Sequence, residues 1–292
     1  MNPVFLYLAS GESLYLGAAL LLAAVAIGHL NDRRMLRSRN VAAWTGLALI
    51  IMACPPFRWL IYATFLAMFA LWYFASNSVV FPKAFRIATA VTLILFLVCG
   101  IVFEFSHRQL PEILFGPVSD HLVVIGDSIS AGLDRRAGPW PTLFQQMTGV
   151  QVRNLAQAGA TSTDAIKMAS KVTPGDGVVL IEIGGNDLLA GVPPEQFERS
   201  LKTIFQDLTG PRRTIVMFEL PLIPNRISYG QVQRRLAAKY GVRLIPKRYF
   251  AQVVSGADAT SDGIHLTQTG MQRMSNLVAR VLLPVLKPMR SS

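Results

Sequence analysis

Four long apolar stretches precede residue 105, and they constrain the fold of this chain more than any other feature of its sequence. Each approaches the roughly 20 residues that a helix needs to cross a hydrocarbon core about 30 Å thick. Composition agrees, because 52% of the residues are apolar and only 15% are charged, against about one quarter charged in soluble domains. The stretches are residues 13–30, 41–54, 59–75 and 87–104.

The charged residues are concentrated in the second part of the chain. Residues 1–117 contain eight Lys and Arg and four Asp and Glu, whereas residues 118–292 contain twenty and thirteen. We therefore predict two domains: an all-α transmembrane region of about four helices over residues 1–117, and a water-facing domain over residues 118–292. The first stretch is not typical of a signal peptide, since no Lys or Arg precedes it.

The number of spans decides which side of the membrane the second domain faces. Pro55 follows the short second stretch at once, so residues 41–75 form either a tight helical hairpin or a broken element. Loops on the cytoplasmic side of a membrane carry more Lys and Arg than loops on the other side. The loops after the first and third stretches hold six Lys and Arg, and those after the second and fourth hold two. We therefore expect an integral protein of a bacterial inner membrane, with its N-terminus and residues 118–292 on the periplasmic side. The six are Arg33, Arg34, Arg37, Arg39, Lys83 and Arg86; the two are Arg58 and Arg108.

The net charge of +11 limits the partners of the chain. A basic protein can bind nucleic acid or anionic lipid headgroups. Without a nucleic-acid motif and beside a membrane segment, lipid is the expected partner. No Asp, Glu, Lys or Arg lies in the middle of a span, where a transport pathway would often place one, so we interpret the helices as an anchor. Cys54 and Cys99 provide neither a disulfide framework nor a metal-ligand spacing.

From His121 onward the hydrophobic pattern alternates between short apolar runs and helical segments. Such alternation predicts a parallel sheet with helices on both faces and its chemistry at the carboxyl ends of the strands. Strands are expected at 122–125, 150–155, 178–183, 214–220 and 242–245. Helices are expected at 140–147, 162–171, 195–208, 228–239 and 268–286.

The first predicted strand ends in Gly126-Asp127-Ser128-Ile129-Ser130. One interpretation is a turn in which Asp127 or Ser128 caps the next helix. The other is a nucleophile at a helix N-terminus, where the dipole favours developing negative charge. An α/β-hydrolase elbow is excluded because Ser130 stands where that motif needs glycine. No Gly-Lys-Ser/Thr follows, which excludes a phosphate loop.

The second and third predicted strands also run into small and polar residues. Gly159 follows the second, either as a loop glycine with positive φ or beside a ligand. The third ends in Gly184-Gly185-Asn186-Asp187, where Asn186 could donate a hydrogen bond to a ligand. The alternative is a turn in which Asp187 caps the next helix. The next residues, Leu188-Leu189-Ala190, either line an acyl pocket or begin a buried helix.

An Asp-x-x-His sequence, Asp262 to His265, precedes the last predicted helix. At this spacing the carboxylate can reach the imidazole Nδ1 and leave Nε2 for a nucleophile. The second domain has one other histidine, His121, and it precedes the first strand, at the wrong end of the sheet. If Ser128 has a histidine base, that base is His265.

Together these four blocks, over about residues 118–286, resemble the SGNH (GDSL-type) hydrolase superfamily, and within it the thioesterase/lysophospholipase and arylesterase branch. The family's Ser, Gly, Asn and His match Ser128, Gly159, Asn186 and His265, and Asp262 matches its third triad residue. The resemblance implies a flavodoxin-like three-layer α/β/α fold. Ile129 departs from the family pattern, in which Leu is usual.

The resemblance implies a serine esterase with the triad Ser128, Asp262 and His265. Its oxyanion hole would consist of the Ser128 and Gly159 N–H groups and the Asn186 amide. No cofactor or metal is expected, and no nucleic acid. The expected substrate is an acyl lipid or an O-acylated envelope glycan. Two rival interpretations are an O-acyltransferase acting on a glycan and a non-catalytic membrane protein that binds acylated ligands.

Overall fold

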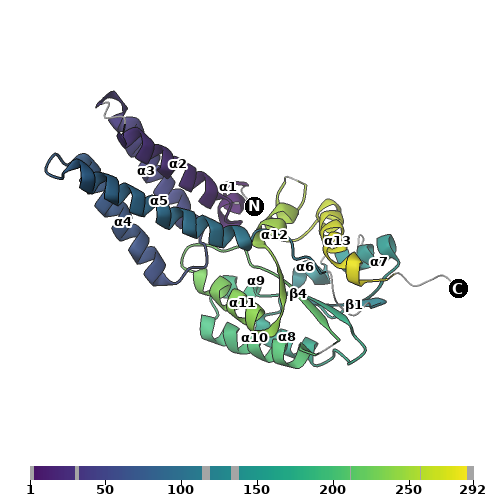
Figure 1. The fold of residues 1–292 in the computed structure, drawn as a ribbon. Helices are drawn as coiled ribbons and strands as arrows, with labels where there is room; N and C mark the ends of the chain where they lie inside the picture. The colour runs from purple at the N-terminus through teal and green to yellow at the C-terminus, as the bar shows by residue number, and fades with distance from the viewer. Residues whose placement is uncertain are drawn as a thin grey trace. The chain divides into compact units, whose positions relative to one another are not determined.

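The computed structural model describes residues 3–29, 33–113, 119–132, 138–210, 212–256 and 258–287. The chain forms two compact units (Figure 1). The helical unit comprises Tyr7–Gln109 and Leu222–Ile227, and the α/β unit comprises Met1–Leu6, Leu110–Pro221 and Ser228–Ser292. Leu222 joins the helical unit through a hydrogen bond from its N–H to the Ala9 carbonyl (3.2 Å).

Every regular element in the described residues of the first part of the chain is a helix. Two of these helices, α4 and α5, are long and apolar enough to cross a membrane, and α2 is a shorter apolar helix. Within the segment 41–75, α3 ends before Pro55 and α4 begins after it, and Trp44 of α3 contacts Phe69 and Tyr73 of α4, as in a helical hairpin. The elements are α1 (Pro3–Ala9), α2 (Ser13–His29), the 3₁₀ helix η1 (Arg33–Met35), α3 (Leu36–Met52), α4 (Trp59–Asn77) and α5 (Lys83–Ser106).

Helices α2 and α3 approach closely at two glycines. A Cβ on Gly17 would lie 2.7 Å from the Gly46 carbonyl oxygen, and a Cβ on Gly46 would lie 2.7 Å from that of Gly17. The Ser13 hydroxyl donates to the Leu49 carbonyl at 3.1 Å. Small residues that let two backbones meet are typical of helix pairs in membranes, where apolar burial alone does not drive association.

Arg39 was counted above among the loop charges, but it lies inside α3 and is only 2% exposed. Its guanidinium donates to the side chains of Asn40 and Asn77 and to the Ser76 carbonyl. These contacts satisfy groups at the C-terminal end of α4, where a cation complements the helix dipole. Arg39 therefore has a structural partner that the loop count did not anticipate.

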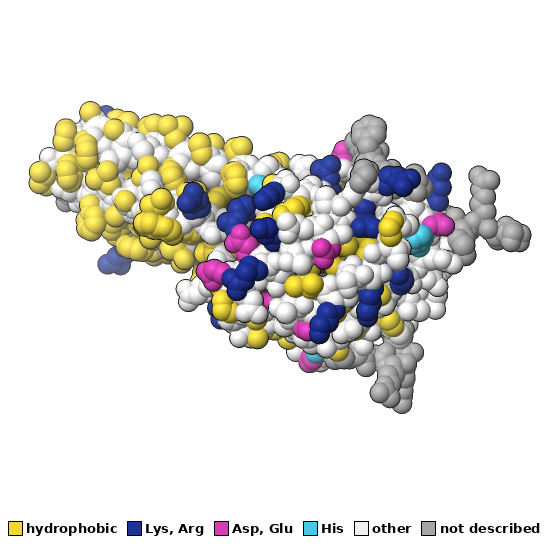
Figure 2. Space-filling model, turned by 90° about the horizontal axis from the view of Figure 1, so that it is seen from below, with side chains coloured by type: hydrophobic (Ala, Val, Ile, Leu, Met, Phe, Trp, Pro, Cys, Tyr) yellow, Lys and Arg dark blue, Asp and Glu magenta, His cyan; other side chains and the backbone are white. Residues whose placement is uncertain are grey.

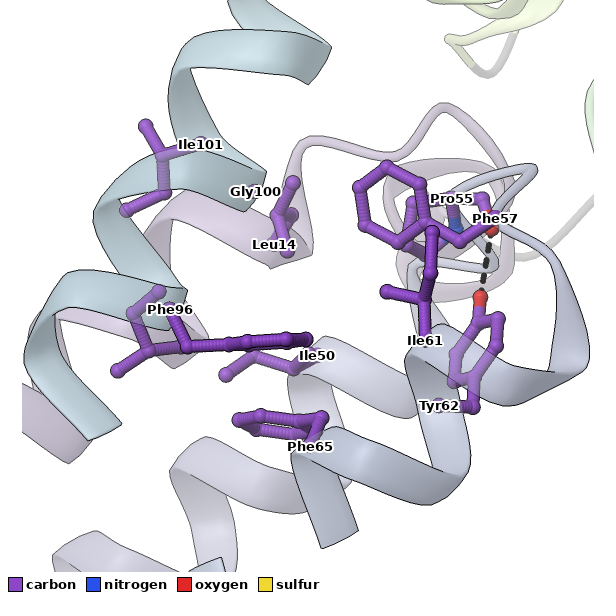
Figure 3. A pocket seen from close by; sticks show the side chains of 11 residues that line it. Leu14, Ile50, Pro55, Phe57, Ile61, Tyr62, Phe65, Phe96, Gly100 and Ile101 are labelled. Carbon is purple, nitrogen blue, oxygen red and sulfur yellow. Dashed lines mark hydrogen bonds between the residues drawn. The ribbon is translucent and has the colours of Figure 1, made fainter. Parts of the chain in front are cut away.

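A small apolar cavity lies within the helical unit (Figure 3). The Tyr62 hydroxyl donates to the Pro55 carbonyl at its edge, at 2.6 Å. None of the predicted site residues lines this cavity. Its walls are Leu14, Ile50, Pro55, Phe57, Ile61, Tyr62, Phe65, Phe96, Leu97, Gly100 and Ile101.

The α/β unit contains a parallel five-stranded sheet with the order β2-β1-β3-β4-β5. This order is flavodoxin-like, as the resemblance implied. Three central strands are buried along nearly their whole length, which explains their continuous apolar sequences. The strands are β1 (His121–Gly126), β2 (Gln151–Asn154), β3 (Val178–Glu182), β4 (Thr214–Phe218) and β5 (Arg243–Ile245).

Helices cover both faces of the sheet (Figure 1). Helices α7, α12 and α13 lie on one side, and α8, α10 and α11 on the other. The core on the α7 and α13 side includes Trp140 and Phe144 of α7, together with Val278 of α13 and the strand residues that they cover. The bounds are α7 (Trp140–Thr148), α8 (Ser162–Ala169), α10 (Pro194–Leu208), α11 (Ile227–Tyr240), α12 (Lys247–Val254) and α13 (Gln268–Leu282).

Three helices of the α/β unit lie outside the five predicted helical ranges, although a helix start at Leu188–Ala190 is one of the two alternatives considered above. They are short: α6 (Ser128–Ala131), α9 (Gly185–Ala190) and α12, and windows of four to eight residues give too little periodicity to detect. The last predicted helix, 268–286, is divided. Its α-helical part ends at Leu282, and a 3₁₀ turn (η2, Leu283–Val285) follows because Pro284 cannot continue the backbone hydrogen bonds.

The surfaces of the two units differ in kind (Figure 2). Exposed large apolar side chains gather on the helices between residues 4 and 105, whereas Lys and Arg side chains are scattered over the α/β unit. A contiguous apolar surface of this size is typical of a protein face that contacts lipid or another protein. Among the described residues of the α/β unit, the exposed large apolar side chains are Val4, Phe5, Met147, Leu189, Ile264 and Leu283.

Candidate active site

Ser128 begins the short helix α6 directly after β1, at the carboxyl edge of the sheet. Asp127 is the N-cap of this helix, and its Oδ1 accepts the Ile129 N–H at 3.0 Å. The capping interpretation of this motif is therefore correct for Asp127, and the cap leaves the Ser128 side chain free of that role. Gly126 is required here, because a Cβ would lie 2.7 Å from the Cβ of Ser130.

Gly159 lies in the loop after β2, at φ +76°, where a side chain would be strained. No atom lies within 4 Å of the position that a Cβ would take. Both interpretations of this glycine therefore agree with its conformation: it allows positive φ, and it leaves open space beside the backbone.

Asn186 lies in the first turn of α9, after β3, and connects the three loops at this edge. Its Nδ2 donates to the Ala160 carbonyl at 2.9 Å and lies 3.4 Å from Oδ2 of Asp127. The Asn186 amide thus touches the residue before Ser128 and the residue after Gly159. Parallel strands bring these distant segments together because their carboxyl ends share one edge of the sheet.

Asp262 and His265 form a closely hydrogen-bonded pair before α13. The Asp262 Oδ1 accepts the N–H groups of Ile264 (3.0 Å) and His265 (2.8 Å), and its Oδ2 lies 2.5 Å from the imidazole Nδ1. The hydrogen bond from the His265 backbone, above all, lowers the pKa of Asp262 far below its ordinary value. An ionised Asp262 bound to Nδ1 leaves Nε2 as the ring atom that can accept a proton.

His265 also lies near the Ser128 turn. The charge of His265 lowers the pKa of Asp127 against the larger effect of burial, which raises it. Within the described residues the ring bonds to Asp262, and no hydrogen bond joins it to the Ser128 hydroxyl. The structure thus brings His265 to the neighbourhood of Ser128 without the direct contact that a proton transfer requires.

Asp187 does not cap the helix that contains it, so the alternative considered from the sequence is wrong. It is fully buried and accepts two hydrogen bonds from Ser162, from the N–H at 2.8 Å and from the hydroxyl at 2.5 Å. The Tyr229 hydroxyl donates to the Asp187 carbonyl at 3.1 Å. Asp187 thereby joins α9, which carries Asn186, to the first residue of α8, close after Gly159.

The sequence reasoning did not identify Glu182, which ends β3 beneath the Ser128 turn and is 5% exposed. Its Oε2 accepts the Ser130 hydroxyl at 2.9 Å, and Ser130 in turn accepts the indole N–H of Trp140 at 3.1 Å. One signal was available: a glutamate within the apolar run Val178–Ile183 is unusual, because a buried carboxyl group needs a polar partner.

His121 begins β1, at the opposite edge of the sheet from Ser128. Its ring lies between two carboxylates, with Nδ1 2.5 Å from Asp120 and Nε2 3.3 Å from Asp176. In the described ranges, no three His, Cys, Asp or Glu side chains are grouped so that they could hold a metal ion.

The known proteins that this chain resembles align with its α/β part. Residues 124–273 match the model of the GDSL-like Lipase/Acylhydrolase family. The chain is 27% identical over 177 residues to thioesterase 1/protease 1/lysophospholipase L1 of Escherichia coli, covering 57% of this chain and 85% of that protein.

Esterase TesA of Pseudomonas aeruginosa is 29% identical over 181 residues, covering 56% of this chain and 89% of that protein. A crystal structure of TesA superposes with a TM-score of 0.50 at 29% identity, over 57% of this chain and 99% of that structure. The likeness therefore covers most of the length of these relatives and leaves more than a third of this chain outside it.

Proposed function

The chain belongs to the GDSL-like Lipase/Acylhydrolase family, and we propose that Ser128 is the nucleophile of its α/β unit. The protein is a serine hydrolase that acts on ester bonds, in keeping with relatives named thioesterase, esterase and arylesterase. The roles of individual residues follow from the geometry above. The observation that carries them is the Asp262–His265 pair, whose carboxylate fixes the imidazole so that Nε2 can serve as a base.

The proposed reaction proceeds through an acyl-enzyme. His265 Nε2 takes the Ser128 hydroxyl proton as the oxygen attacks the ester carbonyl carbon, and Asp262 stabilises the imidazolium. The imidazolium then gives its proton to the leaving alcohol, which leaves an ester on Ser128. Water, activated by the same imidazole, attacks that ester and releases the acid and free Ser128.

The carbonyl oxygen gains negative charge in both tetrahedral intermediates. The Ser128 N–H, the Gly159 N–H and the Asn186 Nδ2 are the proposed donors to it. Gly159 suits this role because the space beside its backbone is open, and Asn186 because it is held at the same edge by the Ala160 carbonyl. Such preorganised donors stabilise charge where it develops.

We propose that α2, α3, α4 and α5 span a bacterial inner membrane and anchor the enzyme, with the α/β unit on the periplasmic side. The support is the exposed apolar surface of these helices and the excess of Lys and Arg in alternate loops. Leaving out the buried Arg39 lowers the number of Lys and Arg in the cytoplasmic loops by one, and these loops still hold more than the periplasmic ones.

Cysteine labelling in intact cells tests the orientation. In a variant without Cys54 and Cys99, a cysteine at Val79, which is 95% exposed between α4 and α5, is expected to resist a membrane-impermeant maleimide. A cysteine at the exposed Ser170 of the α/β unit is expected to react. The reverse pattern would place the catalytic unit in the cytoplasm.

For the substrate, we propose an acyl lipid or an O-acylated envelope glycan. A membrane anchor and a net positive charge of the α/β half favour a substrate at an anionic lipid surface. Leu189, three residues after Asn186, is 66% exposed, whereas Leu188 is buried. An exposed leucine beside the site is suited to contact an acyl chain, so of the two leucines Leu189 is the candidate.

An esterase assay of the purified full-length protein in mild detergent tests the function. We expect p-nitrophenyl esters to be cleaved, Ser128→Ala to abolish cleavage and labelling by a fluorophosphonate probe, and Ser170→Ala to change neither. A preference for long acyl chains would favour lipid over an O-acetylated glycan. Labelling without hydrolysis would favour the acyltransferase, and neither labelling nor hydrolysis by a folded protein would contradict the nucleophilic role of Ser128.

A further inference from the structure

Two carboxyl groups lie together beneath the turn that carries Ser128. Asp127 is 3% exposed and Glu182 is 5% exposed. The Asp127 N–H donates to the Glu182 carbonyl at 3.2 Å, in continuation of the β1–β3 pairing that aligns Gly126 with Glu182. The ends of two adjacent strands therefore hold both side chains in the same buried space.

The surroundings of the two carboxyl groups are unequal. Asp127 accepts an N–H from Ile129 at 3.0 Å and has the Asn186 amide at 3.4 Å. Glu182 accepts one hydroxyl, that of Ser130. Within the described residues, neither carboxyl group forms an ion pair with Lys or Arg. Two negative charges in such a place would be strongly destabilising, since neither is paired with Lys or Arg and each lacks most of its hydration.

We propose that Glu182 is protonated at neutral pH and donates this proton to Asp127, so that the pair carries one negative charge. Asp127 is the better site for that charge, because donors already surround it. Glu182 is the better site for the proton, because its Ser130 partner needs a single acceptor oxygen and leaves the other oxygen to carry hydrogen.

Hydrogen bonding and electrostatics agree with this assignment. The pairing of β1 with β3 holds the two carboxyl groups close together, and a proton shared between them removes the repulsion between two ionised carboxylates. Burial first, and then the charge of Asp127, raise the pKa of Glu182 well above its ordinary value, against hydrogen bonds from Ser130 and from the Asp127 backbone that lower it. Burial also raises the pKa of Asp127, but Ile129, Glu182 and His265 oppose that rise, and the charge of Asp187 adds to it.

The shared proton positions the catalytic groups proposed above. Asp127 caps α6, which begins with Ser128, and its Oδ2 faces the Asn186 amide. With the Glu182 proton on Asp127, the carboxylate is fixed as a cap and competes less with an oxyanion for the Asn186 N–H. Glu182 is thus a positioning residue that touches no substrate. This positioning role depends on the proposed roles of Ser128 and Asn186. The protonation of Glu182 does not depend on them.

Infrared spectroscopy tests the proton without any substrate. We expect the full-length protein at neutral pH to show a protonated-carboxyl C=O band that Glu182→Gln removes. Glu219→Gln is the matched control, because Glu219 is equally buried but forms an ion pair with Arg234 at 2.6 Å, and this variant should keep the band. A spectrum of Glu182→Gln without loss of this band would overturn the proposal, whatever the enzyme's activity.

Kinetics test the positioning role. Glutamine has the shape of a protonated glutamate and can donate to Asp127, so Glu182→Gln should keep kcat within about threefold of wild type. Glu182→Leu removes the donor, and kcat should fall about 10- to 100-fold with little change in KM. A kcat for Glu182→Gln as low as for Glu182→Leu would show that the anion is needed, and would sink the positioning role. Ser128→Ala separates this result from a failure of the nucleophile assignment.

Discussion

Asp187 accepts both the N–H and the hydroxyl of Ser162, at 2.8 and 2.5 Å, although the two residues follow different strands. This bond fixes the loop that contains Gly159 against the helix that contains Asn186. Two of the three proposed oxyanion donors are therefore positioned by one buried carboxylate that does not itself face the substrate.

Asp187→Asn should lower both stability and activity. The new amide hydrogens would face a Ser162 donor, and one buried unsatisfied group costs about 1–3 kcal/mol. We expect a lower thermal unfolding temperature and a lower kcat/KM, and no change for Asp207→Asn, an exposed aspartate in α10. Unchanged stability would mean that Ser162 finds another partner.

Asn186→Ala should retain the fold and lose most turnover. Removing one oxyanion donor typically lowers kcat by about 10²–10³. The measurement is kcat on a p-nitrophenyl ester, with Asn276→Ala of the exposed face of α13 as the matched control. Near-normal turnover of a folded Asn186→Ala protein would exclude Asn186 from the oxyanion hole.

His265→Ala should reduce ester cleavage to near background, because no other imidazole lies at this edge of the sheet within the described residues. His121→Ala is the control, since His121 also contacts aspartates but lies at the opposite edge. We expect it to alter thermal stability and leave kcat near wild type. Equal loss of kcat in the two variants would argue against the triad.

The contribution of Glu182 to stability should fall as pH rises above about 4.3, where glutamate loses its proton in an unfolded chain. The raised pKa of Glu182 means that the folded state keeps this proton over a window in which the unfolded state releases it. This group then lowers stability by at most about 1.4 kcal/mol per pH unit across that window. Thermal unfolding from pH 4 to pH 9 should show that Glu182→Gln gains relative to wild type as pH rises; parallel curves would contradict the raised pKa.

Gly46→Ala should destabilise the α2–α3 pair. Its Cβ would lie 2.7 Å from a carbonyl oxygen of the facing helix, and the two backbones would have to move apart. Gly28→Ala is the control, because its Cβ would meet the Arg39 side chain at an ordinary 3.5 Å. Thermal unfolding in detergent should distinguish the two variants, and equal unfolding temperatures would show that the close contact is unimportant.

The sequence alone determined the α/β class, the parallel sheet and the positions of its five strands. It could do so because buried parallel strands require continuous apolar runs, such as that before Gly126, and these persist whatever surrounds them. The spacing of Asp262 and His265 was also sufficient to predict their hydrogen bond, since a turn of three residues brings the two side chains together locally.

Only the tertiary structure decided the contacts between segments far apart in the chain. The alternative in which Asp187 caps the next helix is wrong, because its carboxylate binds Ser162, and no sequence motif singles out Glu182, which lies beneath Ser128. Arg39 was counted as a loop charge but is buried among α4 residues. Local patterns describe what a residue can do within its own element. The partner of a buried polar group depends on which strands and helices become neighbours, and the fold alone sets that.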